Sequence, residues 1–178
     1  MTRIISGEWR GHTLPKLKTG SVRPTTDRAR TMLFDTLRDL RGLKVLDLYS
    51  GTGAFGFEAL SRGAASLISI DKEHEYIKQQ NLWIDSHLRP FKGYTGDVLK
   101  TISRLTETFD LILADPPYDD GLEQPVLTWI ESHLVPGGRF VFETNKQNTK
   151  PLNSSILLLE KEKVVADTRI QFYKAIES

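Results

Sequence analysis

The stretch Lys44-Val45-Leu46-Asp47-Leu48-Tyr49-Ser50-Gly51-Thr52-Gly53 decides the fold of this chain. An aliphatic run leads into an acidic residue and then into a glycine turn, and a helical pattern follows at once. A buried strand bounded by such a turn predicts the first strand–helix unit of an α/β sheet. Because glycines let a ligand approach the main chain closely, and the next helix offers its N-terminus, the turn also predicts a ligand site.

Strands and helices alternate through the rest of the chain. After a helix over residues 54–62, we expect strands at 67–70, 91–94, 109–114 and 140–143, separated by helices at 73–87, 98–105 and 123–133. Two further strands, 156–160 and 168–174, follow with no helix between them. This order predicts a mostly parallel sheet covered on both faces and closed at one edge by an antiparallel hairpin.

The segment before this pattern has a different character. Residues 3–15 alternate weakly and contain two glycines, which indicates a small β-hairpin. An extended basic loop follows over 17–24, and Thr26-Asp27 then offers N-cap chemistry for a helix that should end near Gly42. At 178 residues the chain fits one domain, and we expect residues 1–42 to form an N-terminal basic extension of it.

Composition excludes several classes of protein. The 39% hydrophobic and 26% charged residues are ordinary for a soluble domain. The absence of cysteine excludes disulfides and thiolate metal sites, and the four scattered histidines show no metal spacing, so no metal is expected. The start Met1-Thr2-Arg3 lacks a signal-peptide core, and no apolar stretch is long enough to cross a bilayer. A cytoplasmic protein with no membrane partner is the expectation.

The net charge of +1 hides an asymmetry. Residues 1–30 carry seven basic side chains and two acidic ones, so the remainder is acidic on balance. A basic arm on an acidic body is suited to a polyanion such as nucleic acid, although the same charges could serve solubility alone. The arginines that we expect to contact RNA phosphates are Arg3, Arg10, Arg23 and Arg28.

A second informative motif is Asp115-Pro116-Pro117-Tyr118, which follows an apolar strand. Two prolines remove two backbone N–H donors, so the carbonyls here meet a ligand without a competing donor. Asp115 adds acceptor oxygens and Tyr118 adds a flat ring. Acceptors beside a ring predict a receptor for a planar group with an exocyclic amino nitrogen, which is either a nucleobase or a side-chain amide.

The glycine turn and two later strand ends predict a cofactor site. Residues 51–56 match G-x-G-x-x-G, which is weak by itself. Asp47, inside the strand end, favours a cation such as an amino-acid ammonium and disfavours a pyrophosphate. Asp71, at the end of the next strand, can accept both hydroxyls of a ribose, which does not separate NAD from an adenosyl cofactor. Asp97 either contacts an adenine amino group or caps the following helix.

Other polar and aromatic residues have more ordinary interpretations. Glu58 is expected to face solvent or to pair locally. Glu143 ends a strand, and its carboxylate could equally serve the site or lie buried or at an edge. Trp9 lies in the basic arm, where it could pack in the core or stack on a base.

With these motifs in hand, the chain resembles the class I S-adenosylmethionine-dependent methyltransferases, and among them the bacterial 16S ribosomal RNA guanine-N2 methyltransferases (RsmD-like). The glycine turn and Asp115–Tyr118 are shared widely. The more specific segments are Arg3-Ile4-Ile5-Ser6-Gly7 with Arg10-Gly11, Arg23-Pro24-Thr25-Thr26-Asp27-Arg28 and Glu58-Ala59-Leu60-Ser61-Arg62-Gly63-Ala64. The resemblance covers nearly the whole chain. Tyr49, Thr52 and Phe55 stand where Phe, Ser and Leu are common, and these changes keep the size class.

The resemblance implies a fold and a reaction. The fold is a Rossmann-like seven-stranded, mostly parallel sheet with a C-terminal antiparallel hairpin. The reaction is transfer of a methyl group from S-adenosylmethionine to the exocyclic N2 of a guanine in 16S rRNA, with the small ribosomal subunit as partner. We expect a monomer. The catalytic residues would be Asp115, Pro116, Pro117 and Tyr118, and the cofactor would be held by Asp47, Tyr49, Ser50, Gly51, Thr52, Gly53, Asp71, Lys72, Gly96 and Asp97.

Three alternatives stay open at this stage. The same acceptor pocket would serve methylation of adenine N6 in DNA or of a glutamine amide in protein, although no additional target-recognition domain is evident. A NAD-dependent oxidoreductase is disfavoured by the placement of Asp47. A non-catalytic RNA-binding module is disfavoured by the intact Asp115–Tyr118 motif.

Overall fold

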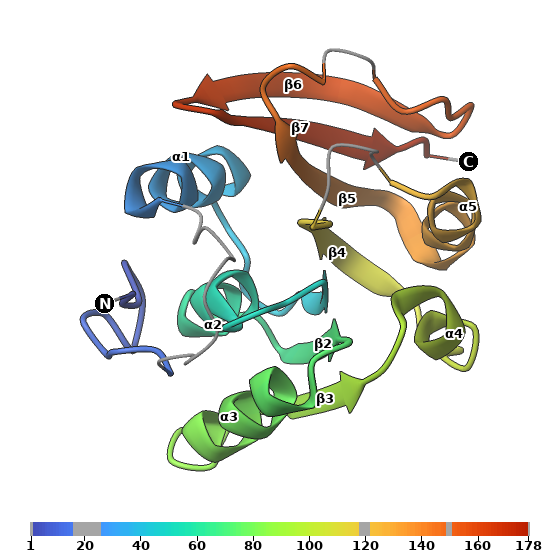
Figure 1. The fold of residues 1–178 in the computed structure, drawn as a ribbon. Coiled ribbons are helices and arrows are strands. Elements are labelled where there is room, and N and C mark those ends of the chain that lie inside the picture. Colours follow the sequence, from blue (N-terminus) through green and yellow to red (C-terminus); the bar gives the residue numbers. More distant parts are fainter. Residues whose placement is uncertain (1, 16–25, 118–121, 149–150, 178) are drawn as a thin grey trace.

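The computed structural model describes residues 2–15, 26–117, 122–148 and 151–177. Its centre is one seven-stranded sheet with the strand order β3-β2-β1-β4-β5-β7-β6 (Figure 1). The strands are β1 (Lys44–Leu48), β2 (Ser66–Asp71), β3 (Phe91–Thr95), β4 (Phe109–Ala114), β5 (Leu134–Asn145), β6 (Leu157–Val165) and β7 (Thr168–Ala175). All neighbours from β3 to β5 pair in parallel, whereas β7 is antiparallel to both β5 and β6. The α/β sheet with a terminal antiparallel hairpin is therefore confirmed.

In the described part of the chain, five helices cover the two faces of this sheet. They are α1 (Asp27–Leu37), α2 (Ala54–Ser61), α3 (His74–Ile84), α4 (Val98–Ile102) and α5 (Gln124–His133). Alternate residues of each strand point to opposite faces, so Val45 packs with α1 and α2 while Leu46 packs with α4 and α5. Two apolar layers result, one on each side of the sheet.

Several element ends differ from the sequence-based expectation. Helix α1 ends at Leu37, before Gly42, because Arg38 leaves the helical conformation with φ 61° and ψ −109°. Strand β5 begins directly after α5 and absorbs Pro136-Gly137-Gly138, which we expected to stay outside it. An irregularity in the β4–β5 register between Phe109 and Leu111 accommodates those residues.

The N-terminal arm, residues 2–15, folds back on itself as expected. Arg3 and Thr13 form an antiparallel bridge, flanked by backbone hydrogen bonds from Ile4 N to His12 O (3.0 Å) and from Gly11 N to Ile4 O (2.9 Å). Trp9 is only 3% exposed and meets Trp83 of α3 edge to face, with ring centroids 5.5 Å apart. The expectation that Trp9 packs is confirmed, and stacking on a base is excluded by its burial.

Glu58 of α2 fastens this arm to the sheet layer. Its carboxylate accepts hydrogen bonds from the backbone N–H groups of Ile5 (2.7 Å) and Ser6 (3.0 Å) and from Arg62 (2.8 Å). The side chain is fully buried, so the expectation of a solvent-facing residue is wrong and that of a local pair is right. A buried carboxylate is tolerated because every one of these donors is directed at it.

Arg30 makes a second fully buried polar contact with the arm. Its Nη2 donates to the carbonyl oxygen of Arg3 and to Asp27, both at 2.7 Å. Burial lowers the pKa of the Arg30 guanidinium, while the charges of Asp27 and Glu58 oppose that shift. The arm is thus attached to both α1 and α2.

Glycine at position 7 is required by this docking. Gly7 and Gly11 both have φ of +86°, but a Cβ at Gly7 would lie 1.9 Å from the carbonyl oxygen of Ser61, whereas a Cβ at Gly11 would meet nothing within 4 Å. We therefore predict that Gly11→Ala lowers the free energy of unfolding by about 1–2 kcal/mol, through backbone conformation alone. Gly7→Ala should cost about 3 kcal/mol or more, because the clash adds to the same backbone term.

Urea denaturation of the two variants measures the difference. Since both substitutions change the unfolded chain in the same way, their difference isolates contact with α2. Equal destabilisation of both variants would contradict the docking of the arm on Ser61.

Candidate functional site

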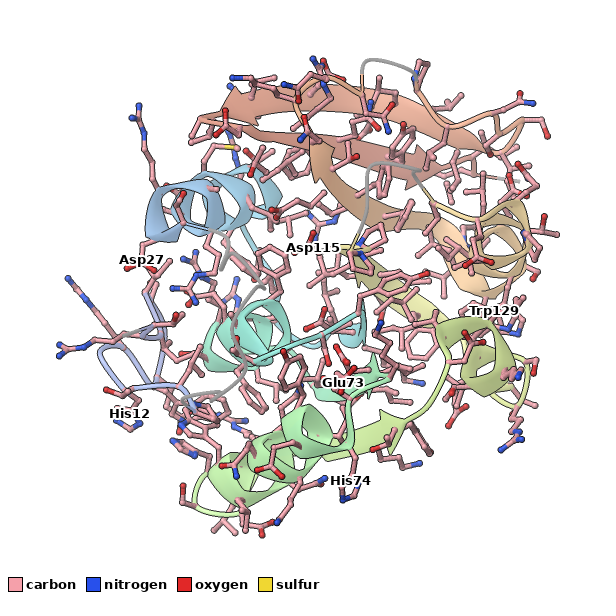
Figure 2. All side chains as sticks on the ribbon, in the orientation of Figure 1. His12, Asp27, Glu73, His74, Asp115 and Trp129 are labelled. Atoms are coloured by element: carbon pink, nitrogen blue, oxygen red, sulfur yellow. The ribbon has the colours of Figure 1, made fainter. Side chains whose placement is uncertain are left out.

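Three carboxylates converge at the carboxyl ends of β1, β2 and β4. Asp47 pairs in register with Ser69 and Leu113, so the position after Leu48 lies between Asp71 at the end of β2 and Asp115 just beyond β4. Neighbouring side chains of a strand point to opposite faces of the sheet. The residues next to Asp47, Asp71 and Asp115 belong to the apolar layer under α4 and α5, so the three carboxylates lie on the other face, which α1–α3 cover. Figure 2 marks Asp115 beyond the tip of β4. The expected gathering of strand-end residues is confirmed.

The glycine turn is held by these carboxylates through its backbone. Gly51 N donates to Asp71 (2.8 Å), and Gly56 N, in the first turns of α2, donates to Asp47 (3.0 Å). Ser50 N donates to the carbonyl oxygen of Ile70 (3.1 Å). The loop between β1 and α2 is consequently fixed to β2 as well as to its own strand.

Gln80 of α3 is a site residue that the sequence did not single out. Its Nε2 donates to Ser50 Oγ (2.9 Å) and to the carbonyl oxygen of Gly51 (2.8 Å). Gln80 is fully buried, and its Oε1 has no hydrogen-bond partner within the described part of the chain. Nothing in the helical pattern of 74–84 distinguishes this glutamine, because its role depends on how α3 packs over the turn.

The carboxylates of Asp47 and Asp115 have strongly perturbed acidities. Desolvation raises the pKa of Asp47 to about 8, against the hydrogen bond from Gly56, and the charges of Asp115 and Asp71 raise it further. Desolvation raises the pKa of Asp115 to about 7. Carboxyl groups with raised pKa values that gather at one site are typical of functional centres. A cation bound near these two groups would favour their ionised forms.

Asp71 keeps capacity to bind a ligand although both of its oxygens are engaged. Oδ2 accepts from Gly51 N, and Oδ1 accepts from Glu73 N at 2.9 Å. A carboxylate has about four acceptor positions, so each oxygen retains one. These two contacts are therefore compatible with the expected ligand role of Asp71.

The remaining candidate cofactor residues differ in their contacts and in how far they are exposed. Tyr49 has a positive φ of 59° at the tip of β1, and desolvation, with the charges of Glu123 and Asp97, raises its pKa to about 12. Asp97 caps α4 by accepting from Lys100 N (3.0 Å), which is the capping alternative. Ser50 and Gly53 are buried, Gly51, Thr52 and Gly96 are half-buried, and Lys72 is exposed.

The proline motif presents acceptors next to this turn. Asp115 and Pro116 are half-buried and Pro117 is exposed. Tyr118 lies outside the described residues, as does Arg23. Of the other predicted RNA contacts, Arg3 and Arg10 are exposed on the N-terminal arm, and Arg28 is exposed on α1.

The structure brings two of the histidines together, which sequence spacing did not suggest. His12 Nδ1 lies 3.0 Å from His87 Nε2, and His87 stacks on Trp83. In the part of the chain that the structure describes, no three His, Asp or Glu side chains are arranged to hold a metal ion. Nor do the described residues include a helix long and apolar enough to cross a membrane.

Comparison with known proteins places this site in context. The chain is 29% identical over 180 residues to the ribosomal RNA small subunit methyltransferase D of Escherichia coli, covering 97% of this chain and 89% of the relative. It is 34% identical over 159 residues to the enzyme of the same name from Haemophilus influenzae, covering 84% and 81%. The solved structure of the Escherichia coli protein yhhF, described as a candidate methyltransferase, superposes with a TM-score of 0.87 at 26% identity, covering 99% of this chain and 98% of that one.

A protein-family profile decides the relationship. The profile described as conserved hypothetical protein 95 matches residues 2–174, which includes the N-terminal arm, the glycine turn and the proline motif. The seven-stranded sheet with its antiparallel hairpin is the fold shared with the methyltransferase structures. The chain therefore belongs to the conserved hypothetical protein 95 family, the RsmD-like group of methyltransferases.

Proposed function

We propose that this protein transfers a methyl group from S-adenosylmethionine to the exocyclic N2 of a guanine in the RNA of the small ribosomal subunit. The observation that carries the proposal is the convergence of the glycine turn, Asp71 and the Asp115-Pro116-Pro117 motif at one end of the sheet. The names of the relatives from Escherichia coli and Haemophilus influenzae supply the substrate class. We further propose that the whole chain acts as one catalytic domain, as a monomer, in the cytoplasm.

The residues present fit this cofactor. S-adenosylmethionine supplies a methyl group already activated on a positively charged sulfur, and it carries ribose hydroxyls and an ammonium group. Asp71 offers free acceptor positions to the hydroxyls, and the buried, unpartnered Oε1 of Gln80 lies beside the same turn. Asp47 is only 1% exposed, so it would act by holding Gly56 and the turn in place more than by direct contact.

The target amino group would be oriented by acceptors alone. Its two N–H bonds would be directed at the Asp115 carboxylate and the Pro116 carbonyl, which leaves its lone pair facing the methyl donor. The carboxylate would also offset the positive charge that develops on this nitrogen. Tyr118 would stack on the base, which must leave its loop to enter the site. The proton released afterwards would go to Asp115 or to water.

One experiment separates this proposal from its alternatives. The protein is incubated with labelled S-adenosylmethionine and, in parallel, with unmodified small subunits, free 16S rRNA, duplex DNA or bulk protein. We expect label in RNA, and digestion followed by mass spectrometry should identify N2-methylguanosine. Label in N6-methyladenine or in methylglutamine would replace the proposed substrate by one of the other amino groups that the same acceptors could hold.

The pH dependence of methyl transfer tests the role of Asp115. Protonation of its carboxylate turns one acceptor oxygen into a donor, and its pKa is about 7 in the free protein, so the rate at subsaturating substrates should fall as the pH drops through 7. Asp115→Asn should lower the rate about 100-fold, because the amide presents a donor as well as an acceptor. Single-turnover rates between pH 5.5 and 8.5 check both statements. A wild-type rate that stays constant over this range would remove Asp115 from the mechanism.

The burial of Asp47 predicts an unusual stability profile. Its pKa is about 8 in the folded protein and about 4 in the unfolded chain, so the folded state holds a proton that the unfolded state loses. Stability should therefore decrease as the pH rises from about 4 to 8. Asp47→Asn should weaken this decrease in the ligand-free protein, because the amide does not ionise.

Thermal melting at pH 5.5, 7.0 and 8.5 measures the effect. Asp85→Asn, which removes an exposed carboxyl at the end of α3, is the matched control and should follow the wild type. A melting profile of Asp47→Asn that parallels the wild type would contradict the assignment.

A further inference from the structure

A basic groove runs between α1 and the edge strand β6, outside the site described above. It has a volume of about 470 Å³ and joins a second hollow of about 260 Å³ through Thr36, Arg38 and Lys161. Figure 1 shows α1 beside the end of the sheet where β6 turns into β7. The cations that line the groove are Arg28, Arg38, Lys161 and Lys163.

Successive charged side chains of β6 point to opposite faces of the sheet. Lys161 and Lys163 are two residues apart, so both point toward α1 and line the groove. Glu162, between them, points to the opposite face, where it pairs with Arg169 and accepts from Gln171 (3.0 Å). The alternation places both lysines in the groove and Glu162 behind it, while Glu160 lines the second hollow beside Lys161.

Among the described residues, these four cations lack the carboxylate partners that several other surface lysines have. Across the described ranges, none of the ion pairs includes Arg28, Arg38, Lys161 or Lys163, whereas Lys78, Lys92, Lys146 and Lys174 each face a carboxylate. The acidic residue that lines the larger hollow, Asp35, faces Arg62 at 3.9 Å. With Arg139 and Glu160 of the second hollow included, the lining carries five cationic and two acidic side chains, so the groove keeps net positive charge that is available to an anion.

The register of the sheet connects this groove to Asp115. Ala114 pairs with Phe142, Phe142 with Gln171, and Gln171 with Glu162. One residue further along each strand, Asp115 and Lys163 lie at the same level of the sheet, separated by three steps from strand to strand. At about 4.8 Å per strand this separation is about 14 Å, which a few nucleotides of RNA can span.

Arg38 occupies a backbone conformation that favours glycine. Its φ of 61° and ψ of −109° lie close to the first central position of a type II′ turn. An arginine there is strained, and its side chain lines both hollows of the groove. An arginine in such a conformation points to a role for its guanidinium rather than for its backbone.

We infer that the groove between α1 and β6 binds the phosphate backbone of the RNA that flanks the target guanine. This inference rests on the proposed function and adds a surface on the C-terminal hairpin to the N-terminal arginines. Lysines and arginines that meet phosphates fix the position of a nucleic acid without reading its sequence. The groove would hold the RNA while the flipped base reaches Asp115.

Paired substitutions test the assignment. Lys161→Gln with Lys163→Gln should weaken binding of 16S rRNA about three- to tenfold near 100 mM salt and reduce the slope of log affinity against log salt by about 1–2. Cofactor affinity should stay the same. Lys78→Gln with Lys92→Gln removes the same charge near the opposite sheet edge, at α3 and β3, and should leave RNA affinity within about twofold. Lys161→Arg with Lys163→Arg should retain wild-type binding.

Arg38→Gly gives an independent test, because it should change stability and RNA affinity in opposite directions. Relief of the backbone strain should raise the melting temperature, while loss of the guanidinium should weaken RNA binding. A variant that is more stable and binds RNA as tightly as the wild type would overturn the role of Arg38.

The outcomes also separate this inference from the proposed function. If the wild type methylates small subunits and the groove variants match it in RNA affinity and salt slope, the groove is not a phosphate site and the proposed function stands. If the wild type neither binds nor methylates ribosomal RNA, the proposed substrate is wrong and the assignment of the groove to RNA fails with it.

Discussion

The structure depends on the parallel pairing of β1 with β2 and β4. That pairing brings three carboxylates, Asp47, Asp71 and Asp115, to one end of the sheet on one face. Like charges in a dry site repel each other and are costly to ionise. They are tolerated because backbone N–H groups of the glycine turn donate to two of them and because two of the carboxyl groups have raised pKa values. The turn, its anchoring by Gln80 and the acceptor corner at Pro116 follow from this arrangement.

Buried polar contacts also define the N-terminal region. Glu58 and Arg30 lie fully inside the protein and bind the backbone of the arm rather than water. Removal of either group would break the hydrogen bonds that hold the backbone of the arm against α1 and α2. The arm therefore has a fixed position beside α2, and its arginines are presented from a defined surface.

Much of the fold and the core of the candidate site could be predicted from the sequence. The apolar runs determine the strands, and polar residues at their ends must meet at one edge of a parallel sheet, so the sequence alone singles out Asp47, Asp71 and Asp115. Residues whose roles depend on packing between distant elements could not be found in this way. Gln80 has an ordinary place in its helix, Glu58 has the pattern of an exposed position, and the groove joins residues from opposite ends of the chain.

The raised pKa values of Asp47 and Asp115 have a thermodynamic consequence for ligand binding. Near neutral pH Asp47 is largely protonated in the free protein, and Asp115 is about half protonated. A positively charged ligand favours their ionised forms, so its arrival must expel protons into the solvent. The heat measured in calorimetry would then include the ionisation enthalpy of the buffer, and titrations in phosphate and in Tris would give different apparent enthalpies for the same association.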